Sequence, residues 1–399
     1  MRVPAPCYQV SRDLAEVFPH LRPAECRGLA LWVVGAILAG SACQTAVISA
    51  LAPLGLGASA LRQRLREWTY DGADRAAPCA TQLEVARCFA PLLGWVMRLW
   101  RGDSLPLAID LTSLGTRWVV VAVCVLYRGI AIPVAWQVRP GPGYGPWMPT
   151  ICELLRHLAP AVPASVRVLV LTDRGLWSSA LWRQIRGLGW SPVMRIRPDA
   201  TFAPQGQMRR PAKRLVPGPG HAWVGAGTAF KHAHVRRTGT LVVVWEADQA
   251  EPWLILTDLS PDDIGLAWYG LRGWVEQGFR ALKSAGWQWD RIRRTDPERV
   301  ARHWLVLAVA SVLSAAYGSR VEDATWAGIA PSHFHTPRPW PPERVVARAV
   351  NLLTTGRDWL RVGLPRARRW RSLWLLPTPL PRPTPHLVMH RYQPPEALP

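Results

Sequence analysis

The 399-residue sequence predicts an α/β fold in which a mixed β-sheet with a β-rich insertion follows an all-helical N-terminal domain. Three observations carry this prediction. Residues 1–100 hold apolar residues at helical spacing and no strand pattern, whereas residues 101–196 alternate short Val- and Ile-rich runs with amphipathic segments. Residues 197–262 are rich in Gly and Pro and contain two further strand-like runs. A chain of this length is expected to form two or three domains.

The N-terminal region is expected to be helical and to bind DNA. Residues 28–39 and 42–52 are apolar, residues 59–68 form a short basic helix, and residues 81–100 form an amphipathic one. No charged residue occurs from Gly28 to Leu61, a stretch long enough in principle to span a bilayer. Glycines and polar residues interrupt it, however. We therefore expect two buried helices joined near Gly40 and no contact with a membrane.

The order of the central elements identifies the sheet. Three strands at residues 105–109, 118–127 and 130–138 form a meander. A helix, a strand, a second helix and another strand follow at residues 147–158, 166–171, 176–188 and 192–196. This is the order of a ribonuclease-H-like fold, whose first and fourth strands lie side by side. After the insertion, a helical pattern extends from about Gly265 to about Ala285.

These patterns divide the chain into three predicted parts: residues 1–100, residues 101–310 with the insertion at about 197–262, and residues 311–399. The last part is basic and rich in Pro and Arg. It contains one plausible helix at residues 342–353 and is expected to be at least partly extended or disordered.

The charge of the chain predicts a polyanionic partner. The formal net charge is +21, and the last third of the chain is the most basic. Only three of the 48 basic residues are lysines, which suggests GC-rich coding. Such coding explains the choice of Arg over Lys better than the excess of base over acid. Double-stranded DNA is therefore the expected partner.

Cysteine usage bears on the compartment. The seven cysteines include no C-x-x-C pair, which argues against a zinc ribbon and for a reducing environment. The first residues do not resemble a secretory signal. We expect a cytoplasmic, nucleoid-associated protein.

Two aspartates end the first and fourth predicted strands. Asp110 and Asp173 would then lie side by side at one edge of the sheet. Phosphoryl transfer between nucleic-acid strands uses two divalent ions, and Mg²⁺ prefers carboxylate oxygens brought together from distant segments. Taken singly, each aspartate is more often a turn or helix-cap residue.

A more specific pattern occurs in the segment YGLRGWVEQGFRALK, residues 269–283. On one continuous helix Tyr269, Arg272, Glu276 and Lys283 would lie on a single stripe, because their spacings of three, four and seven residues follow the helical period. The alternative is an ordinary surface helix with an Arg272–Glu276 pair. A lysine at position 283, in a chain that strongly prefers arginine, favours a functional stripe.

Together these features resemble the bacterial insertion-sequence DDE transposases with the YREK signature, over about residues 100–310. The resemblance implies that Asp110, Asp173 and Glu276 are catalytic and bind two Mg²⁺ or Mn²⁺ ions. It also implies that Tyr269, Arg272 and Lys283 contact the transposon end. The implied activity is metal-dependent cleavage of DNA at the end repeats and strand transfer into target DNA, carried out by a homodimer.

Two further sets of candidates are weaker. Arg291, Arg293 and Arg294 follow the signature segment and are expected to contact DNA backbone, with a plain solvated loop as the alternative. Some members of the family stack a flipped base on an insertion tryptophan, for which Trp245 and Trp253 are candidates. Core packing is the commoner role of a tryptophan.

Two alternative functions stay open: a ribonuclease-H-like nuclease that cannot join strands, and a catalytically inactive, transposase-derived DNA-binding protein.

Overall fold

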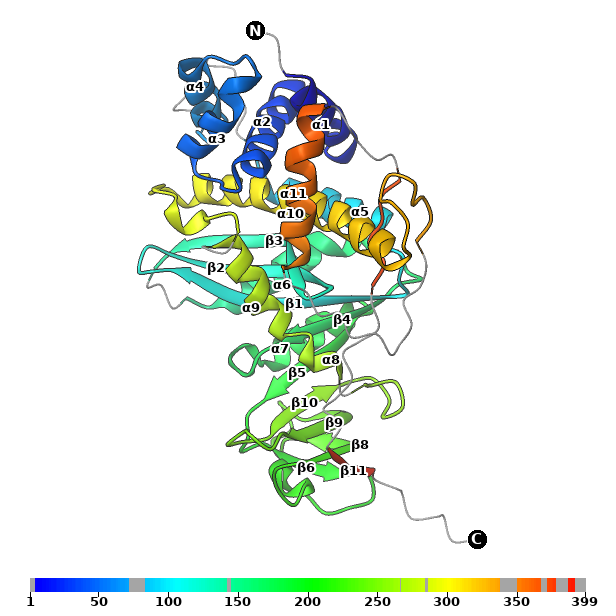
Figure 1. Cartoon of the computed structure of the whole chain (residues 1–399). Coiled ribbons are helices and arrows are strands. Elements are labelled where there is room, and N and C mark those ends of the chain that lie inside the picture. Colours follow the sequence, from blue (N-terminus) through cyan, green and yellow to red (C-terminus); the bar gives the residue numbers. More distant parts are fainter. Residues whose placement is uncertain are drawn as a thin grey trace. The chain divides into compact units, whose positions relative to one another are not determined.

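The computed structural model describes residues 4–71, 83–141, 145–265, 267–283, 286–337, 350–366, 372–377 and 387–391 (Figure 1). The chain forms two compact units. The helical unit comprises Met1–Gly102, Leu111–Ala164 and Trp274–Thr378, and the sheet unit comprises Asp103–Asp110, Ser165–Gly273 and Pro379–Pro399. Each unit is described by itself.

The helical unit begins with four helices: α1 (Ala5–Val17), α2 (Pro23–Ala39), α3 (Gln44–Leu51) and α4 (Ala58–Trp68). Helix α2 is apolar on all sides and packs against the other three. The turn between α2 and α3 bends by 88°, and Gly40 adopts a positive φ of 63° within it. Because glycine reaches this conformation without a steric penalty, the uncharged stretch forms two helices joined at Gly40, as predicted. Helix α2 is buried as expected, but α3 is buried on one face only.

The same unit contains α5 (Phe89–Leu99), the hairpin of β2 (Trp118–Tyr127) and β3 (Ile130–Pro140), and α6 (Trp147–Leu158). Arg128 and Gly129 form the two-residue turn of the hairpin, both with positive φ. Such turns match the twist of the flanking strands. The hairpin and α6 confirm the predicted elements.

A long central helix, α10 (Pro297–Trp326), was not predicted from the sequence. Its 30 residues are buried on nearly all sides, so it lacks the polar stripe by which a surface helix is recognised. Its start does carry a local signal: the Asp296 carboxylate accepts a hydrogen bond from Arg299 N at 2.9 Å, and Pro297 occupies the first helical position. Helix α11 (Leu352–Gly363) crosses it where Gly318 and Gly356 allow close backbone approach. The predicted helix at 342–353 falls almost entirely outside the described residues.

Charged groups are buried along α10. Arg128 Nη1 lies 2.8 Å from Asp323 Oδ1, and neither side chain is exposed. The Trp374 indole donates to Asp323 Oδ2 at 2.7 Å, and Arg128 Nε donates to the Leu376 carbonyl at 2.9 Å. These bonds tie the β2–β3 turn and the segment 372–377 to α10.

By length and composition α10 could cross a membrane, as could α2 and α3 if the bent pair formed one span. Within the described residues no other helix meets that test. The apolar stretch of α10 is 94% buried inside the protein, which is also the property of a core helix in a water-soluble protein.

The sheet unit is built on one mixed sheet. Its strands occur in the order β1, β4, β5, β10, β9, β8, β6, β7, with β11 beside β8. Strand β1 (Ser104–Leu114) belongs to this unit as far as Asp110. It pairs in parallel with β4, and β4 pairs in parallel with β5. The first and fourth strands therefore lie side by side, as predicted. The remaining bounds are β4 (Arg167–Thr172), β5 (Ser191–Ile196), β6 (Thr201–Pro204), β7 (Arg210–Pro211), β8 (His221–Ala229), β9 (Arg237–Trp245), β10 (Trp253–Thr257), β11 (Val388–Arg391) and the helix α7 (Ser179–Gly187).

The predicted β-rich insertion contributes strands to this sheet, because β10 pairs antiparallel with β5 and β9 with β10. The two expected runs are β9 and β10, whereas β6, β7 and β8 were not predicted. The predicted fold class is confirmed: helices precede a ribonuclease-H-like mixed sheet.

The compact units differ from the predicted segments 1–100, 101–310 and 311–399. The first 102 residues and the last helices belong to one unit because α2 packs directly against α10 and α11. The functional division of the chain into three regions stays a prediction.

Candidate active site

Asp110 and Asp173 come together in the sheet unit where the pairing of β1 with β4 ends. The prediction that Asp110 ends the first strand was wrong, because β1 continues to Leu114. The last paired residues of β1 and β4 are Ile109 and Thr172, and each aspartate follows directly. Leu105, Leu107 and Ile109 on β1, like all of β4 after Arg167, are buried, so packing fixes this end of the sheet. The predicted neighbourhood of the two carboxylates is confirmed.

Arg272 is bound between the two acids. Its Nη2 lies 3.0 Å from Asp110 Oδ2 and 3.7 Å from Asp173 Oδ2. The side chains are partly shielded, at 20% exposure for Arg272, 15% for Asp110 and 36% for Asp173. One guanidinium thus neutralises two carboxylates that would otherwise repel each other.

The other oxygen of Asp173 has a local structural role. Asp173 Oδ1 accepts a hydrogen bond from Leu176 N at 3.0 Å and caps the short 3₁₀ turn Arg174–Leu176. The cap interpretation of this residue is therefore correct for one oxygen. Because the cap fixes the carboxylate plane, Oδ2 stays directed at Arg272.

The segment 265–285 is not one helix, and that prediction was wrong. It forms α8 (Ala267–Gly270) and α9 (Gly273–Leu282), with the junction at Leu271 and Arg272. Gly270 and Gly273 flank this junction, and each glycine disfavours a helix by about 1 kcal/mol relative to alanine. Tyr269, Arg272, Glu276 and Lys283 consequently do not share one helical stripe.

Tyr269 is a packing residue of the sheet unit. Its side chain is 4% exposed and meets the Trp253 ring edge-on at 5.3 Å between centroids. Burial raises the pKa of its hydroxyl to about 12, with Arg272 and Arg195 acting in the opposite direction. Arg195 in turn lies over the Trp253 ring at 5.4 Å. Arg195, which was not among the predicted site residues, thus packs with Trp253 and Tyr269 beside Arg272.

Glu276 and Lys283 belong to the helical unit. Helix α9 holds Glu276 exposed to solvent, while Gly278 and Phe279 on the same helix are buried. A Cβ at Gly278 would lie 2.5 Å from the Ala131 Cβ, so α9 lies close against β3. Burial lowers the pKa of Lys283, which follows α9, although the charge of Asp290 acts in the opposite direction.

The three arginines after α9 differ from one another. Arg291 and Arg293 are exposed, as expected for side chains that reach a phosphate. Arg294 is largely buried: its Nη1 donates to Thr69 Oγ1 at 2.7 Å, and its guanidinium lies over the Trp32 ring. Burial, with repulsion from Arg299 and Arg302, lowers the pKa of Arg294 to about 10.

The two tryptophan candidates both have structural contacts. The Trp245 indole donates to the Gln249 carbonyl at 2.9 Å and closes the turn after β9. Trp253 packs against Tyr269 and Arg195. Both are half-buried. Base stacking by either residue stays a prediction.

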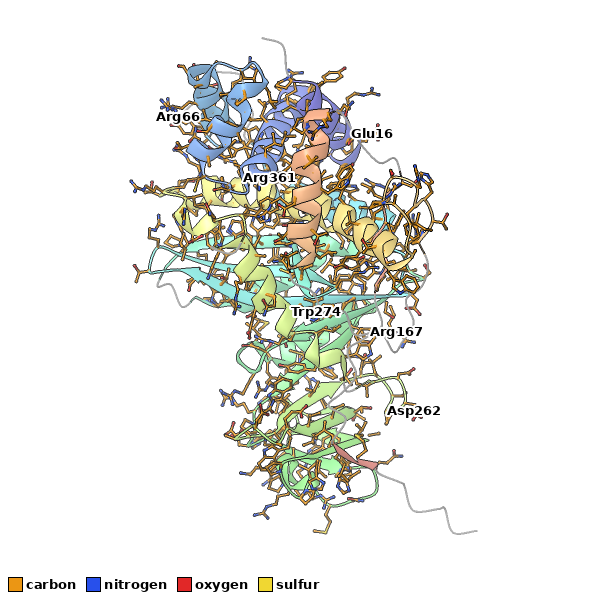
Figure 2. The ribbon with its side chains drawn as sticks, in the orientation of Figure 1. Glu16, Arg66, Arg167, Asp262, Trp274 and Arg361 are labelled. Atoms are coloured by element: carbon orange, nitrogen blue, oxygen red, sulfur yellow. The ribbon has the colours of Figure 1, made fainter. Side chains whose placement is uncertain are left out.

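The donor chemistry of the sheet-unit pair fits a divalent cation, since two carboxylates converge there; Arg272 occupies the space between them and supplies the positive charge in this structure. Within the described residues no group of three His, Cys, Asp or Glu side chains is assembled closely enough to hold a metal ion. Glu276, the third predicted ligand, belongs to the helical unit. The last segment of that unit begins at Trp274, which is labelled in Figure 2.

Part of the chain is similar to a known protein family. Residues 116–313 match the model of a family described as the transposase DDE domain. The matched residues make up just under half of the chain, and over them the chain is similar to that family. The match contains Asp173 and Glu276 and begins six residues after Asp110.

A solved structure, the piggyBac transposase synaptic complex with hairpin DNA, is similar at 12% sequence identity with a TM-score of 0.40. The alignment covers 92% of this chain and 78% of that one, and the likeness is weak and concerns the fold alone. No curated protein matches the chain.

Proposed function

We propose that this chain is a DNA transposase, which cleaves DNA at transposon end repeats and joins the freed ends to target DNA. The observation that carries the proposal is the meeting of Asp110 and Asp173 where the pairing of β1 with β4 ends, in a chain whose residues 116–313 match the transposase DDE domain model. The bacterial insertion-sequence type is favoured by the residues Tyr269, Arg272, Glu276 and Lys283 at the spacing of the YREK signature.

Asp110, Asp173 and Glu276 would hold two Mg²⁺ or Mn²⁺ ions. When bound, such ions activate the attacking oxygen and stabilise the leaving one. The chain's own contribution is to position the carboxylates: parallel pairing of β1 and β4 aligns the aspartates, and the Asp173 cap orients one of them. Glu276 would complete the set from α9.

The remaining polar residues would bind DNA. Arg291 and Arg293 are exposed and can reach backbone phosphates, and Lys283 supplies a compact cation beside α9. Tyr269 would act by packing behind Arg272, because its hydroxyl is buried. We also propose a homodimer on paired transposon ends and a cytoplasmic, nucleoid-associated location.

The proposal is tested by incubating the full chain and Mg²⁺ with the DNA that flanks its gene, and mapping cleavage at matching end repeats. Asp110→Asn, Asp173→Asn and Glu276→Gln should each abolish cleavage and leave DNA binding largely intact, because each removes one ligand charge at nearly constant volume. Retained cleavage in one variant would remove that residue from the site.

Two further outcomes distinguish the alternatives. Cleavage without joining in the presence of target DNA would indicate a ribonuclease-H-like nuclease. Binding of end repeats without cleavage in Mg²⁺ or Mn²⁺ would indicate an inactive, transposase-derived DNA-binding protein.

A further inference from the structure

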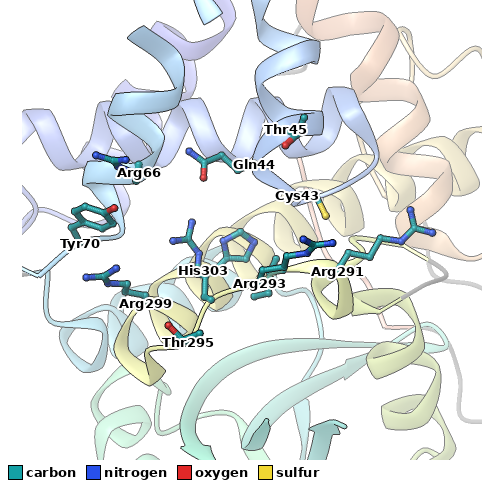
Figure 3. A pocket seen from close by; sticks show the side chains of 12 residues that line it. Cys43, Gln44, Thr45, Arg66, Tyr70, Arg291, Arg293, Thr295, Arg299 and His303 are labelled. Atoms are coloured by element: carbon teal, nitrogen blue, oxygen red, sulfur yellow. The ribbon is translucent and has the colours of Figure 1, made fainter. Parts of the chain in front are cut away.

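The helical unit contains a pocket of about 580 Å³, called here the arginine pocket (Figure 3). Four segments line it: the start of α3 at residues 43–45, the end of α4 with Arg66 and Tyr70, the loop 291–295, and the first turns of α10 with Arg299 and His303. All of these segments belong to one unit. The pocket therefore exists independently of how the two units are arranged.

Its charge is entirely positive. Five lining residues are arginines and none is an aspartate or glutamate; the arginines are Arg66, Arg291, Arg293, Arg294 and Arg299. Among the acids nearby, Asp71 Oδ1 accepts from Arg302 Nη2 at 2.6 Å, and Asp296 caps α10.

The arginines are held in place by the fold. The guanidinium of Arg299 lies 4.2 Å and that of Arg66 5.4 Å from the centre of the Tyr70 ring. The loop that bears Arg291, Arg293 and Arg294 is tied to the start of β2, because Arg117 Nη1 donates to the Ile292 carbonyl and the Trp118 indole donates to the Arg294 carbonyl, both at 3.2 Å. Such ordering lowers the entropy lost when a ligand binds.

The start of α3 adds further positive character. This helix begins at Gln44, which lines the pocket, and no side chain caps it. The first N–H groups of a helix have no acceptor within the helix, and they carry a partial positive charge that favours anions.

The shape of the pocket favours an extended anion. Figure 3 shows Arg66 and Arg299 beside Tyr70 on one side, and Arg291 with Arg293 on the other. The volume of about 580 Å³ far exceeds that of a small ion, since one water occupies only about 30 Å³. Arginines on both sides of so wide a pocket suit several phosphates better than one.

We infer that the arginine pocket binds consecutive phosphate groups of a single DNA strand. The inference deepens the proposed function, because it rests on DNA being the substrate. It assigns a role to Arg66, Arg299 and the α3 terminus, which sequence analysis did not connect with Arg291, Arg293 and Arg294. It also implies that the N-terminal helices and the segment after α9 grip the same strand.

The test is the salt dependence of DNA binding, measured in EDTA with the full chain and a 30-base-pair duplex. The pocket variant Arg66→Gln/Arg291→Gln/Arg293→Gln should lower the slope of log K against log[salt] by about 2 to 3, since each phosphate contact contributes about 0.9. Affinity at moderate salt should fall by about 10- to 1,000-fold. Arg294 and Arg299 are left unchanged, because burial and ring contacts give them structural roles.

A matched control removes the same charge elsewhere. Arg98, Arg156 and Arg183 are exposed and lie outside the pocket. Their triple Gln variant should keep a slope within about one unit of wild type. Equal losses in the two triple variants, with unchanged circular dichroism, would refute the pocket and leave only general charge attraction.

A second experiment distinguishes a DNA strand from a small anion as the ligand of the arginine pocket. Inorganic phosphate and pyrophosphate are titrated against wild type and the pocket variant while thermal stability is followed. Stabilisation specific to the wild type that short DNA cannot displace would assign the pocket to a small anion and overturn the inference.

These assays need no cleavage. If wild type never cuts end repeats but the pocket variant still shows the reduced slope of log K against log[salt], the proposed function fails and the inference stands. If wild type cuts end repeats and the pocket variant binds like the control, the inference fails and the function stands.

Discussion

Arg272 Nη2 donates a hydrogen bond to Asp110 Oδ2 at 3.0 Å and lies 3.7 Å from Asp173 Oδ2. The arginine is thus the counter-ion of both carboxylates in the metal-free chain. Divalent ions prefer the same oxygens, so metal and arginine act on one pair of acids. This relationship was not expected, because the sequence placed Arg272 on a DNA-contacting stripe.

Replacing Arg272 should therefore change the response to metal. Arg272→Ala leaves two neighbouring carboxylates without their shared cation, so the metal-free protein should lose thermal stability and gain more from Mg²⁺ or Mn²⁺ than wild type gains. The melting temperature is measured across a metal titration. Arg167→Ala, which removes an exposed partner of Asp263, is the control. An identical metal response in both variants would contradict the counter-ion role.

The buried Arg128–Asp323 pair should contribute strongly to the stability of the helical unit. Asp323→Ala removes the nearer of the two carboxylates that pair with buried Arg128, leaves only Glu322 Oε2 at 3.5 Å, and removes the acceptor of the Trp374 indole. Loss of one partner of a buried ion pair costs about 3–5 kcal/mol in the free energy of unfolding. Urea denaturation measures it. The exposed Asp358→Ala should stay within about 0.5 kcal/mol of wild type.

The buried side chain of His303 should make the free energy of unfolding decrease in acid. Burial, followed by the charge of Arg294, lowers its pKa well below 6.5 in the folded state. Below pH 6.5 the unfolded chain binds a proton that the folded chain does not, so the free energy of unfolding falls as pH decreases, by at most about 1.4 kcal/mol per pH unit from this group. Above pH 6.5 this contribution is constant.

His303→Gln should reduce that slope, measured by urea denaturation at pH 7.5, 6.5 and 5.5. The exposed His234→Gln is its control and should keep the wild-type slope. A His303 variant with the full acid slope would show that other groups set the pH dependence.

The close approach of α9 to β3 predicts opposite effects for two glycines. A Cβ at position 278 would lie 2.5 Å from the Ala131 Cβ and 2.8 Å from its backbone nitrogen, whereas one at position 273 meets nothing within 4 Å. Gly278→Ala should destabilise the protein by about 1–3 kcal/mol and shift the helix that carries Glu276, reducing cleavage. Gly273→Ala should be neutral or stabilising by up to about 1 kcal/mol. Equal stability of the two variants would show that the contact is easily relaxed.

The sequence predicted most of the elements because their signals are local. Short apolar runs rich in Val, Ile and Leu marked β2, β3, β4 and β5, and helical spacing marked α6. The pairing of β1 with β4 followed from element order alone, and with it the neighbourhood of Asp110 and Asp173. The strands β6 to β8 were missed, because Gly- and Pro-rich stretches carry little periodicity.

Only the tertiary structure determined the partners of the charged side chains. No periodicity reveals that Arg272 pairs with residues 162 and 99 positions away, that the partly buried Arg294 lies over Trp32, or that α10 is buried on nearly all sides. A guanidinium is attracted to whichever carboxylate the fold brings within a few ångströms, and electrostatic energy depends on that distance and on burial, not on sequence separation. The sequence thus determined which residue types can perform phosphoryl-transfer chemistry, while packing determined which of them meet.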